Sequence, residues 1–147
     1  MIDRKIIGKV FPAYTVEMEK GRLCFFAQVI GETDPIYTDE IAAQAAGHRS
    51  ILVPPTFLFG LDIEQPNAFA WLLEANMNLA RILHGEQSFR YYTPAYAGDS
   101  LTFESKIVDV YDKRDGALEF VVKEIKVTNQ LGEHVADLRN TLIQRNR

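Results

Sequence analysis

Three short stretches of the sequence carry side chains that could do chemistry. The first runs from Gly31 to Tyr37 and places two carboxylates, Glu32 and Asp34, and one phenol on a single loop before an alanine-rich segment. If that segment is a helix, its first N–H groups and its dipole favour a negative charge in this loop, such as an oxyanion. The plain alternative is that Asp34-Pro35 only makes a turn and that Glu32 is solvated.

The second stretch is Val53-Pro54-Pro55-Thr56-Phe57, a rigid turn that leads into a predicted helix. Backbone N–H groups in the first turn of a helix have no partner within the helix, so they could bind a carbonyl oxygen. Ordinary helix initiation after two prolines would explain the same residues without a ligand.

The third stretch begins at His84-Gly85-Glu86-Gln87-Ser88-Phe89 and is followed by Pro94 and by Ala97-Gly98-Asp99-Ser100-Leu101. His84 could act as an acid or a base because imidazole titrates near neutral pH, although a histidine beside a glycine also serves in turns. The three histidines do not show the spacing of metal ligands, so we expect no metal ion. The chain also lacks a Gly-x-Ser-x-Gly elbow, a Walker loop and a dinucleotide fingerprint, so no organic cofactor is indicated.

Composition bounds the class of protein. The chain has 147 residues, of which 47% are hydrophobic and 24% charged, and its net charge is -4. These values predict one globular domain over residues 1–147 and argue against binding to nucleic acid. The apolar stretch 51–61 is short and broken by prolines, so no membrane span is expected. Because Cys24 is the only cysteine and the N-terminus does not resemble a secretory signal, we expect a cytoplasmic protein without an internal disulfide.

The spacing of apolar residues predicts helices in the first half of the chain. Helical periodicity marks four segments, at residues 23–30, 39–46, 57–61 and 68–73. The first of these helices would open near Thr15, through its hydroxyl, and close at Gly31. The second contains four alanines, and its small side chains would let it sit close against a curved sheet.

From Gln87 onward the period becomes alternating, which predicts strands. They are expected over Ser88–Tyr92, Leu101–Ile107, Leu118–Val127 and Ala136–Leu142, with turns at Asp115-Gly116 and Asn129–Gly132. Short turns make neighbouring strands antiparallel, so the fold class is α+β. A change of parity between Val122 and Ile125 indicates a bulge or a strand buried on both faces.

Taken in order, these stretches resemble the MaoC-like group of hot-dog-fold acyl-thioester dehydratases and hydratases, in particular the dehydratase domain related to fatty acid synthase. The resemblance covers the chain from about Tyr14 to its end, and its most specific parts are the second and third stretches. It implies an antiparallel sheet wrapped around a central helix, here Asp39 to Ala46. It also implies a homodimer, or a heterodimer with another hot-dog subunit, with acyl-thioester tunnels where the two units meet.

Active members of this group carry the pattern Gly-Asp-x-Asn-Pro-(Ile or Val)-His, in which the aspartate and the histidine hold water and move protons. In this chain Glu32 replaces the aspartate, Asp34 the asparagine and Tyr37 the histidine. A phenol, with a reference pKa of about 10, is a poor base at pH 7. The resemblance therefore implies a subunit with a substituted catalytic pair, which shapes the acyl pocket and works with a catalytic partner.

The expected function is that of a 3-hydroxyacyl-thioester dehydratase, equivalently an R-specific enoyl-CoA hydratase, acting on acyl-CoA or acyl-carrier thioesters. CoA would be part of the substrate and not a cofactor. If the chain is catalytic alone, Glu32 would orient water and Tyr37 or His84 would donate a proton. The substrate-binding residues implied by the resemblance are Asp34, Pro55, Thr56, Phe57 and Gln87. An acyl-CoA thioesterase and a non-catalytic acyl-CoA-binding subunit remain as alternatives.

Overall fold

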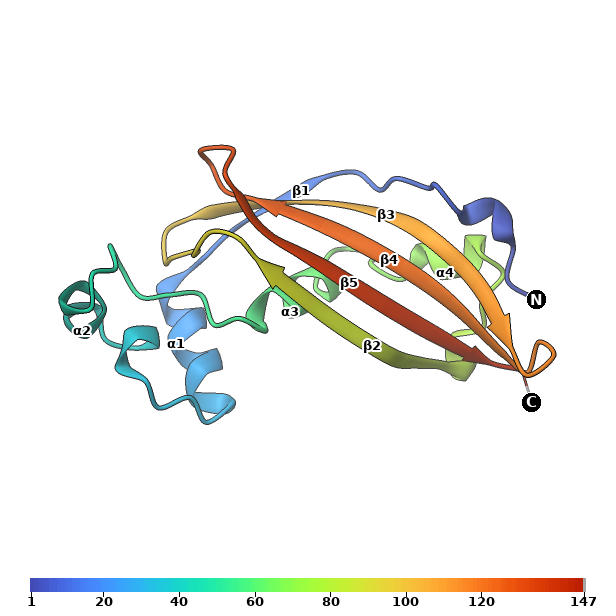
Figure 1. Cartoon of the computed structure of the whole chain (residues 1–147), viewed down its shortest axis with the longest axis horizontal. Coiled ribbons are helices and arrows are strands. Elements are labelled where there is room, and N and C mark those ends of the chain that lie inside the picture. The colour runs from blue at the N-terminus through green and yellow to red at the C-terminus, as the bar shows by residue number, and fades with distance from the viewer. Residues whose placement is uncertain (147) are drawn as a thin grey trace.

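The computed structural model describes residues 1–146, and its main feature is one five-stranded antiparallel sheet (Figure 1). The strands are β1 (Tyr14–Glu17), β2 (Ile82–Tyr91), β3 (Ser100–Lys113), β4 (Leu118–Thr128) and β5 (His134–Arg145). Their order in the sheet is β1-β3-β4-β5-β2, so that β2 forms one edge and the short β1 the other.

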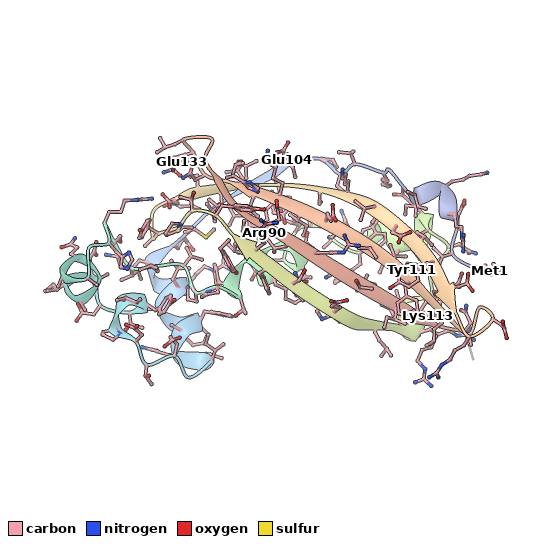
Figure 2. All side chains as sticks on the ribbon, viewed as in Figure 1. Met1, Arg90, Glu104, Tyr111, Lys113 and Glu133 are labelled. Atoms are coloured by element: carbon pink, nitrogen blue, oxygen red, sulfur yellow. The ribbon has the colours of Figure 1, made fainter. Side chains whose placement is uncertain are left out.

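Helices and turns occupy one side and the ends of the curved sheet. They are η1 (Arg4–Ile6), α1 (Lys20–Val29), η2 (Pro35–Tyr37), α2 (Glu40–Ala45), α3 (Phe57–Ile63), α4 (Ala70–Glu74) and η3 (Leu79–Arg81). In Figure 1, α1 and α2 lie at one end of the molecule and α3 runs beneath the sheet, while both termini lie at the opposite end. Figure 2 places Met1, Tyr111 and Lys113 near the termini and Glu133 at the far β4–β5 hairpin. None of the helices described over residues 1–146 has the length and apolar run needed to cross a membrane.

The helix that the sheet wraps around is α3. It buries Phe57, Leu58 and Leu61 in one cluster with the inward-facing side chains of β3, β4 and β5. Helix α2, by contrast, buries only Ala43 and lies beyond the end of the sheet (Figure 1). The predicted α+β hot-dog class is therefore confirmed, but the prediction that Asp39–Ala46 is the central helix is wrong. Alanines favour helix formation yet offer little apolar area to bury, so the bulkier α3 holds the central position.

The four predicted strands and both hairpin turns are confirmed, with longer strands than expected. The sequence did not indicate β1, and β2 starts at Ile82 instead of near Gln87. Thr15 lies within β1 and does not cap α1, whose N-cap is Glu19. A four-residue strand that pairs only with β3 carries too short an alternation to be recognised before the partner is known.

Burial on both faces accounts for the change of parity along β4, in which four consecutive residues, Glu119 to Val122, are buried. The pairing of β3 with β4 shifts between Ile107 and Asp109, which face Lys123 and Val122. The extra residue lies in β3 and puts the buried positions of β3 out of phase on its two sides, whereas β4 pairs with β5 in a continuous register from Leu118 to Val127. Of the two explanations that the sequence left open, a bulge or a strand buried on both faces, the second applies to β4, and the bulge belongs to β3.

Packing against β5 explains the glycine of the His-Gly-x-Gln-x-Phe stretch. A Cβ atom at Gly85 would lie 2.5 Å from the Cδ1 atom of Ile143 and 3.1 Å from the carbonyl oxygen of Thr141. The register between β2 and β5 shifts at this position, between His84 and Glu86. Glycine is thus required for close approach of the two strands, and the motif residue has a structural role.

The aspartate of the Ala-Gly-Asp stretch also has a structural role. Asp99 is fully buried and accepts hydrogen bonds from the Tyr96 N–H (2.8 Å), the Gln130 amide (2.8 Å) and the Arg49 guanidinium. Burial by itself would raise the pKa of Asp99, but the hydrogen bonds from Arg49, Gln130 and Tyr96 hold it below its ordinary value. The carboxylate ties together the turn that leads into β3.

Candidate functional site

The loop that carries the substituted catalytic pattern begins with a helix C-terminal cap. Gly31 adopts a φ of 75°, in the left-handed region that glycine enters without strain. Its N–H donates to the Gln28 carbonyl (3.1 Å), and the Glu32 N–H donates to the Ala27 carbonyl (2.9 Å). These two bonds form a Schellman motif, which ends α1 and fixes the direction in which the loop leaves it.

Both carboxylates of the loop are engaged by backbone N–H groups. Glu32 Oε1 accepts from the N–H groups of Thr33 (2.8 Å) and Asp34 (2.9 Å), and Asp34 Oδ1 accepts from Ile36 (3.1 Å). Asp34 thus caps η2 and makes the turn that was one of the two interpretations of its sequence. Glu32 is half-buried and holds the loop, so its Oε1 oxygen is not available to bind a water in the way that a catalytic aspartate would.

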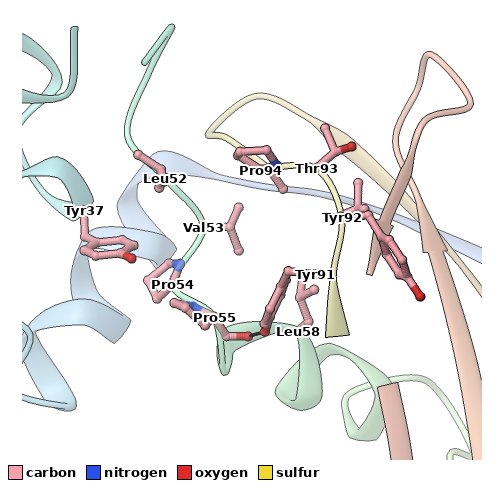
Figure 3. A pocket seen from close by; sticks show the side chains of 12 residues that line it. Tyr37, Leu52, Val53, Pro54, Pro55, Leu58, Tyr91, Tyr92, Thr93 and Pro94 are labelled. Atoms are coloured by element: carbon pink, nitrogen blue, oxygen red, sulfur yellow. Dashed lines mark hydrogen bonds between the residues drawn. The ribbon is translucent and has the colours of Figure 1, made fainter. Parts of the chain in front are cut away.

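Tyr37 lies at the wall of an apolar pocket of about 300 Å³. Figure 3 shows its ring facing the Pro54-Pro55 turn, with Tyr91 across the pocket and the hydroxyl of Tyr92 directed away. The remaining lining residues come from the segment after α2, the start of α3, the segment after β2 and β5: Leu52, Val53, Leu58, Thr93, Pro94, Ala95 and Val135. The pocket size lies at the lower end of the range for small-molecule sites.

The phenols of Tyr37 and Tyr91 remain protonated at neutral pH. Burial raises the pKa of Tyr37, and the nearby carboxylates of Glu32 and Asp34 raise it further. Burial and the neighbouring Tyr37 likewise raise the pKa of Tyr91, whose hydroxyl donates to the Pro55 carbonyl. Protonated phenols can donate a hydrogen bond to a carbonyl oxygen, but they do not accept a proton from carbon.

Only part of the Val-Pro-Pro-Thr-Phe stretch lines this pocket. Pro54 and Pro55 line the pocket, whereas Phe57 is buried in the core, where its ring meets that of Phe26 edge-on at 5.2 Å. The Phe57 N–H donates to the Pro54 carbonyl (3.0 Å), so it is not directed at a ligand. Thr56 is exposed and makes no capping hydrogen bond.

His84 and Gln87 lie away from the Tyr37 pocket. His84 is seven residues from Tyr91 along β2, a separation of roughly 23 Å at about 3.3 Å per residue. Its ring stacks on Phe59 with the centroids 4.9 Å apart. Gln87 donates from its amide to the Ser88 carbonyl at 3.3 Å. The structure thus brings Tyr37, Glu32, Asp34 and Pro55 together and leaves the histidine at a second location.

Sequence reasoning missed Tyr91 as a pocket residue. The signal was present, because Tyr91 and Phe89 share one face of an alternating strand, and that face turns toward the core.

Among residues 1–146, no group of three or more His, Cys, Asp or Glu side chains is placed to hold a metal ion.

Comparison with known proteins agrees with this geometry. Residues 5–138 match the family model described as "FAS1-like, dehydratase domain region". A "UPF0336 protein" of Streptomyces avermitilis is 32% identical over 147 residues, which cover 98% of this chain and 95% of the relative. The chain therefore belongs to the FAS1-like dehydratase region family.

Solved structures share the fold at low sequence identity. The "C terminal truncated HadBC (3R-Hydroxyacyl-ACP Dehydratase) complex" of Mycobacterium tuberculosis superposes with a TM-score of 0.80 at 24% identity, covering 96% of this chain and 99% of the other. The R-hydratase PhaJ1 of Pseudomonas aeruginosa gives 0.69 at 19% identity, with 96% and 83% covered. A MaoC-like dehydratase of Rhodospirillum rubrum gives 0.71 at 17% identity, with 100% and 98% covered.

Proposed function

We propose that this chain is the acyl-binding subunit of a 3-hydroxyacyl-thioester dehydratase, equivalently an R-specific enoyl-CoA hydratase, and that a hot-dog partner supplies the catalytic pair. The observation that carries the proposal is the state of Tyr37. It stands where the family pattern has a histidine and borders the apolar pocket, yet burial and two carboxylates raise its pKa. The apolar pocket suits an acyl group, and none of its lining residues is an aspartate, a glutamate or a histidine that could serve as the base.

The reaction itself explains why a base is needed. Dehydration removes a proton from C2 of the 3-hydroxyacyl thioester and expels the C3 hydroxyl as water, which leaves a double bond between C2 and C3. One group must accept the C2 proton and one must protonate the departing hydroxyl. A neutral Tyr37 phenol could donate to the thioester carbonyl and so stabilise the enolate-like oxygen, but the C2 proton would pass to the partner's base.

Strand β2 is the surface we assign to that partner. It is ten residues long, forms the edge of the sheet and pairs only with β5 among the described strands. Its apolar Leu83 is 50% exposed and Tyr91 44% exposed. A long edge strand with apolar side chains favours pairing with another chain. The HadBC structure is that of a complex, which supports the same arrangement, whether the partner here is a second copy or another hot-dog subunit.

The test is hydration of crotonyl-CoA, followed by loss of the absorbance of the conjugated thioester. We expect the chain alone to be at least 100-fold slower than a mixture with a hot-dog subunit that carries an intact Gly-Asp-x-Asn-Pro-x-His pattern, because general acid–base catalysis contributes about 10²–10⁴-fold. Partner alone is the control. In the mixture, Tyr37→Phe should lower the rate by no more than about 10²–10³-fold, the effect of losing one donor to the enolate-like oxygen, whereas Ala95→Trp, which fills the pocket, should abolish it. Loss of all activity in Tyr37→Phe would show that this chain carries the catalysis itself.

A non-catalytic acyl-CoA-binding subunit is the second candidate, and the same absence of a base at the pocket favours it. It predicts binding of crotonyl-CoA by calorimetry with no turnover in any mixture. A thioesterase would need a carboxylate that activates water, and the Glu32 Oε1 oxygen is instead held by two backbone N–H groups. Release of free CoA thiol from acyl-CoA by the chain alone would favour the thioesterase over the other two candidates.

A further inference from the structure

A row of polar side chains crosses the otherwise apolar inner face of the sheet. Lys123 in β4 is the pairing partner of Asn140 in β5, and Asn140 is the partner of Gln87 in β2. Residues directly opposite in antiparallel strands point to the same face. The three side chains therefore form one line beneath α3, and Asp62 descends from that helix to meet it.

Two members of the set form an ion pair within the protein. The Lys123 ammonium lies 2.5 Å from Asp62 Oδ2, with side-chain exposures of 13% and 7%. The Tyr14 hydroxyl donates to the other carboxylate oxygen of Asp62 at 3.3 Å. The charges at this position therefore compensate each other, and an ionic ligand is not required to balance them.

Asn140 is a member of the row whose side-chain hydrogen bonding the protein leaves incomplete. It is 6% exposed, and its Oδ1 atom has no hydrogen-bond partner among residues 1–146. A buried amide oxygen normally finds a donor, because leaving it without one carries the full cost of its desolvation. Gln87 Oε1, on the neighbouring strand, shares this condition.

Asn140 lines a cavity of about 220 Å³ between the sheet, α3 and the segment that leads into α4. Rings form much of its wall, from Phe59, Phe69, Trp71 and His84. An apolar cavity of about 150 Å³ is enough to hold benzene, so this one accommodates a ring or a short alkyl chain. His84, which the sequence marked as a candidate acid or base, belongs to this cavity and not to the Tyr37 pocket.

We propose that this cavity binds a neutral, apolar group that carries a hydroxyl, and that the hydroxyl bonds to the Asn140 amide. The rings and alkyl side chains suit the apolar body of such a group, while Asn140 supplies the polar partner inside the cavity. A hydroxyl both donates and accepts, so it matches the amide in either orientation of its oxygen and nitrogen. Because Lys123 and Asp62 already pair with each other, the ligand does not need to carry a charge.

This site is separate from the Tyr37 pocket. The two cavities have no lining residue in common, although both border α3, one at Leu58 and the other at Phe59. The hydroxyl-bearing group could be a free small alcohol or the far end of an acyl chain whose thioester lies at the Tyr37 pocket. The binding site itself does not depend on the proposed dehydratase function.

The experiment compares benzyl alcohol with toluene, two ligands that differ only by one hydroxyl group, by titration of the complete chain followed by amide NMR shifts. We expect the ratio of the toluene Kd to the benzyl alcohol Kd to fall about tenfold in Asn140→Leu, the effect of one hydrogen bond. An unchanged ratio would overturn the proposal, and so would the failure of both ligands to bind the unaltered chain.

A second variant makes the test independent of how well Asn140→Leu folds. Ala68→Phe places a ring in the cavity from its wall while Asn140 is retained, and it should abolish binding of both ligands. Ala80→Phe is the matched control, because Ala80 is exposed and outside the cavity, and its Kd values should equal those of the unaltered chain. Unaltered binding in Ala68→Phe would place the ligand elsewhere and refute the proposal.

Competition separates the two sources of the hydroxyl. Displacement of benzyl alcohol by a twelve-carbon 2-enoyl-CoA with a terminal hydroxyl, but not by crotonyl-CoA, would identify the far end of an acyl chain. Displacement by neither would support a free small alcohol. Either result upholds the site, and the crotonyl-CoA hydration assay reports on the dehydratase proposal separately.

Discussion

Breaking the ion pair between Asp62 and Lys123 should destabilise the protein far more than breaking an ion pair on its surface. Both side chains are almost fully enclosed between α3 and β4, and the two charged atoms lie 2.5 Å apart. When one partner of such a pair is removed, the other remains as an uncompensated buried charge. We therefore predict that Asp62→Leu lowers the free energy of unfolding by about 3–5 kcal/mol.

The partner variant and the double variant refine the magnitude. In Lys123→Met the Asp62 carboxylate keeps the hydrogen bond from Tyr14, so its loss of stability should lie toward the lower end of about 3–5 kcal/mol. The double variant Asp62→Leu/Lys123→Met leaves no buried charge. Since apolar replacements of buried ion pairs are often neutral or stabilising by about 1–4 kcal/mol, the double variant should be close to the unaltered chain or above it.

Urea denaturation followed by far-UV circular dichroism measures these free energies, and a double-mutant cycle gives the coupling between the two residues. The control is Glu124→Gln, which breaks the pair between Arg139 and Glu124, whose side chains are 50% and 42% exposed. Its effect should stay below about 1 kcal/mol. If Asp62→Leu costs no more than this control, or if the single effects simply add in the double variant, the pair is not buried and the reasoning is wrong.

Three further predictions address the two sites and a buried carboxylate. The triple variant Glu32→Asp/Asp34→Asn/Tyr37→His restores the family pattern, and we expect it to hydrate crotonyl-CoA alone about 100-fold faster than the unaltered chain; no gain would mean that more than the pattern was lost. Asn140→Leu should raise the free energy of unfolding by about 1–3 kcal/mol in urea, because it removes the unpaired amide oxygen; a lower stability would contradict this. The lowered pKa of Asp99 contributes stability that is present above its ordinary value of 3.8 and is lost as the pH falls through the folded-state pKa. Asp99→Asn should therefore flatten the acid limb of a plot of the free energy of unfolding against pH. An acid limb equal to that of the unaltered chain would show that other carboxylates determine the loss of stability in acid.

The sheet was predictable because its pattern is local. Alternation along Leu101–Ile107 and Leu118–Val127 gives strands, and the turns between them give antiparallel pairing. The change of parity left open a bulge or a strand buried on both faces, and the structure shows β4 buried on both faces. The choice of the central helix was not local. Helix α3 has only seven residues, and its place under the sheet depends on the apolar area of Phe57 and Leu61, which becomes decisive only when the sheet is present.

The candidate site was half predictable for a related reason. Tyr37, Glu32 and Asp34 are close in the chain, so one short loop brings them together whatever the rest of the fold does. The distance between His84 and Tyr37 depends on the course of β2 along the sheet, which the sequence does not give. The hydrogen bonds from backbone N–H groups to Glu32 and Asp34 likewise follow from the geometry of the loop. They show that these two carboxylates hold the backbone of the loop in place.

The polar row beneath α3 departs most clearly from the rules that predict the rest of the molecule. An alternating strand with one buried face calls for apolar residues at Lys123 and Asn140, and leucine or methionine at these positions would satisfy the packing without a buried charge or an unpaired amide. Such departures from local consistency are expected where a protein binds or reacts, since they are unfavourable for stability alone. Two members of the row, Lys123 and Asn140, line the cavity that contains His84, which is separate from the loop with the substituted catalytic pattern. The polar row is therefore the region of this chain that folding explains least, and specificity for the non-thioester part of a ligand would reside there.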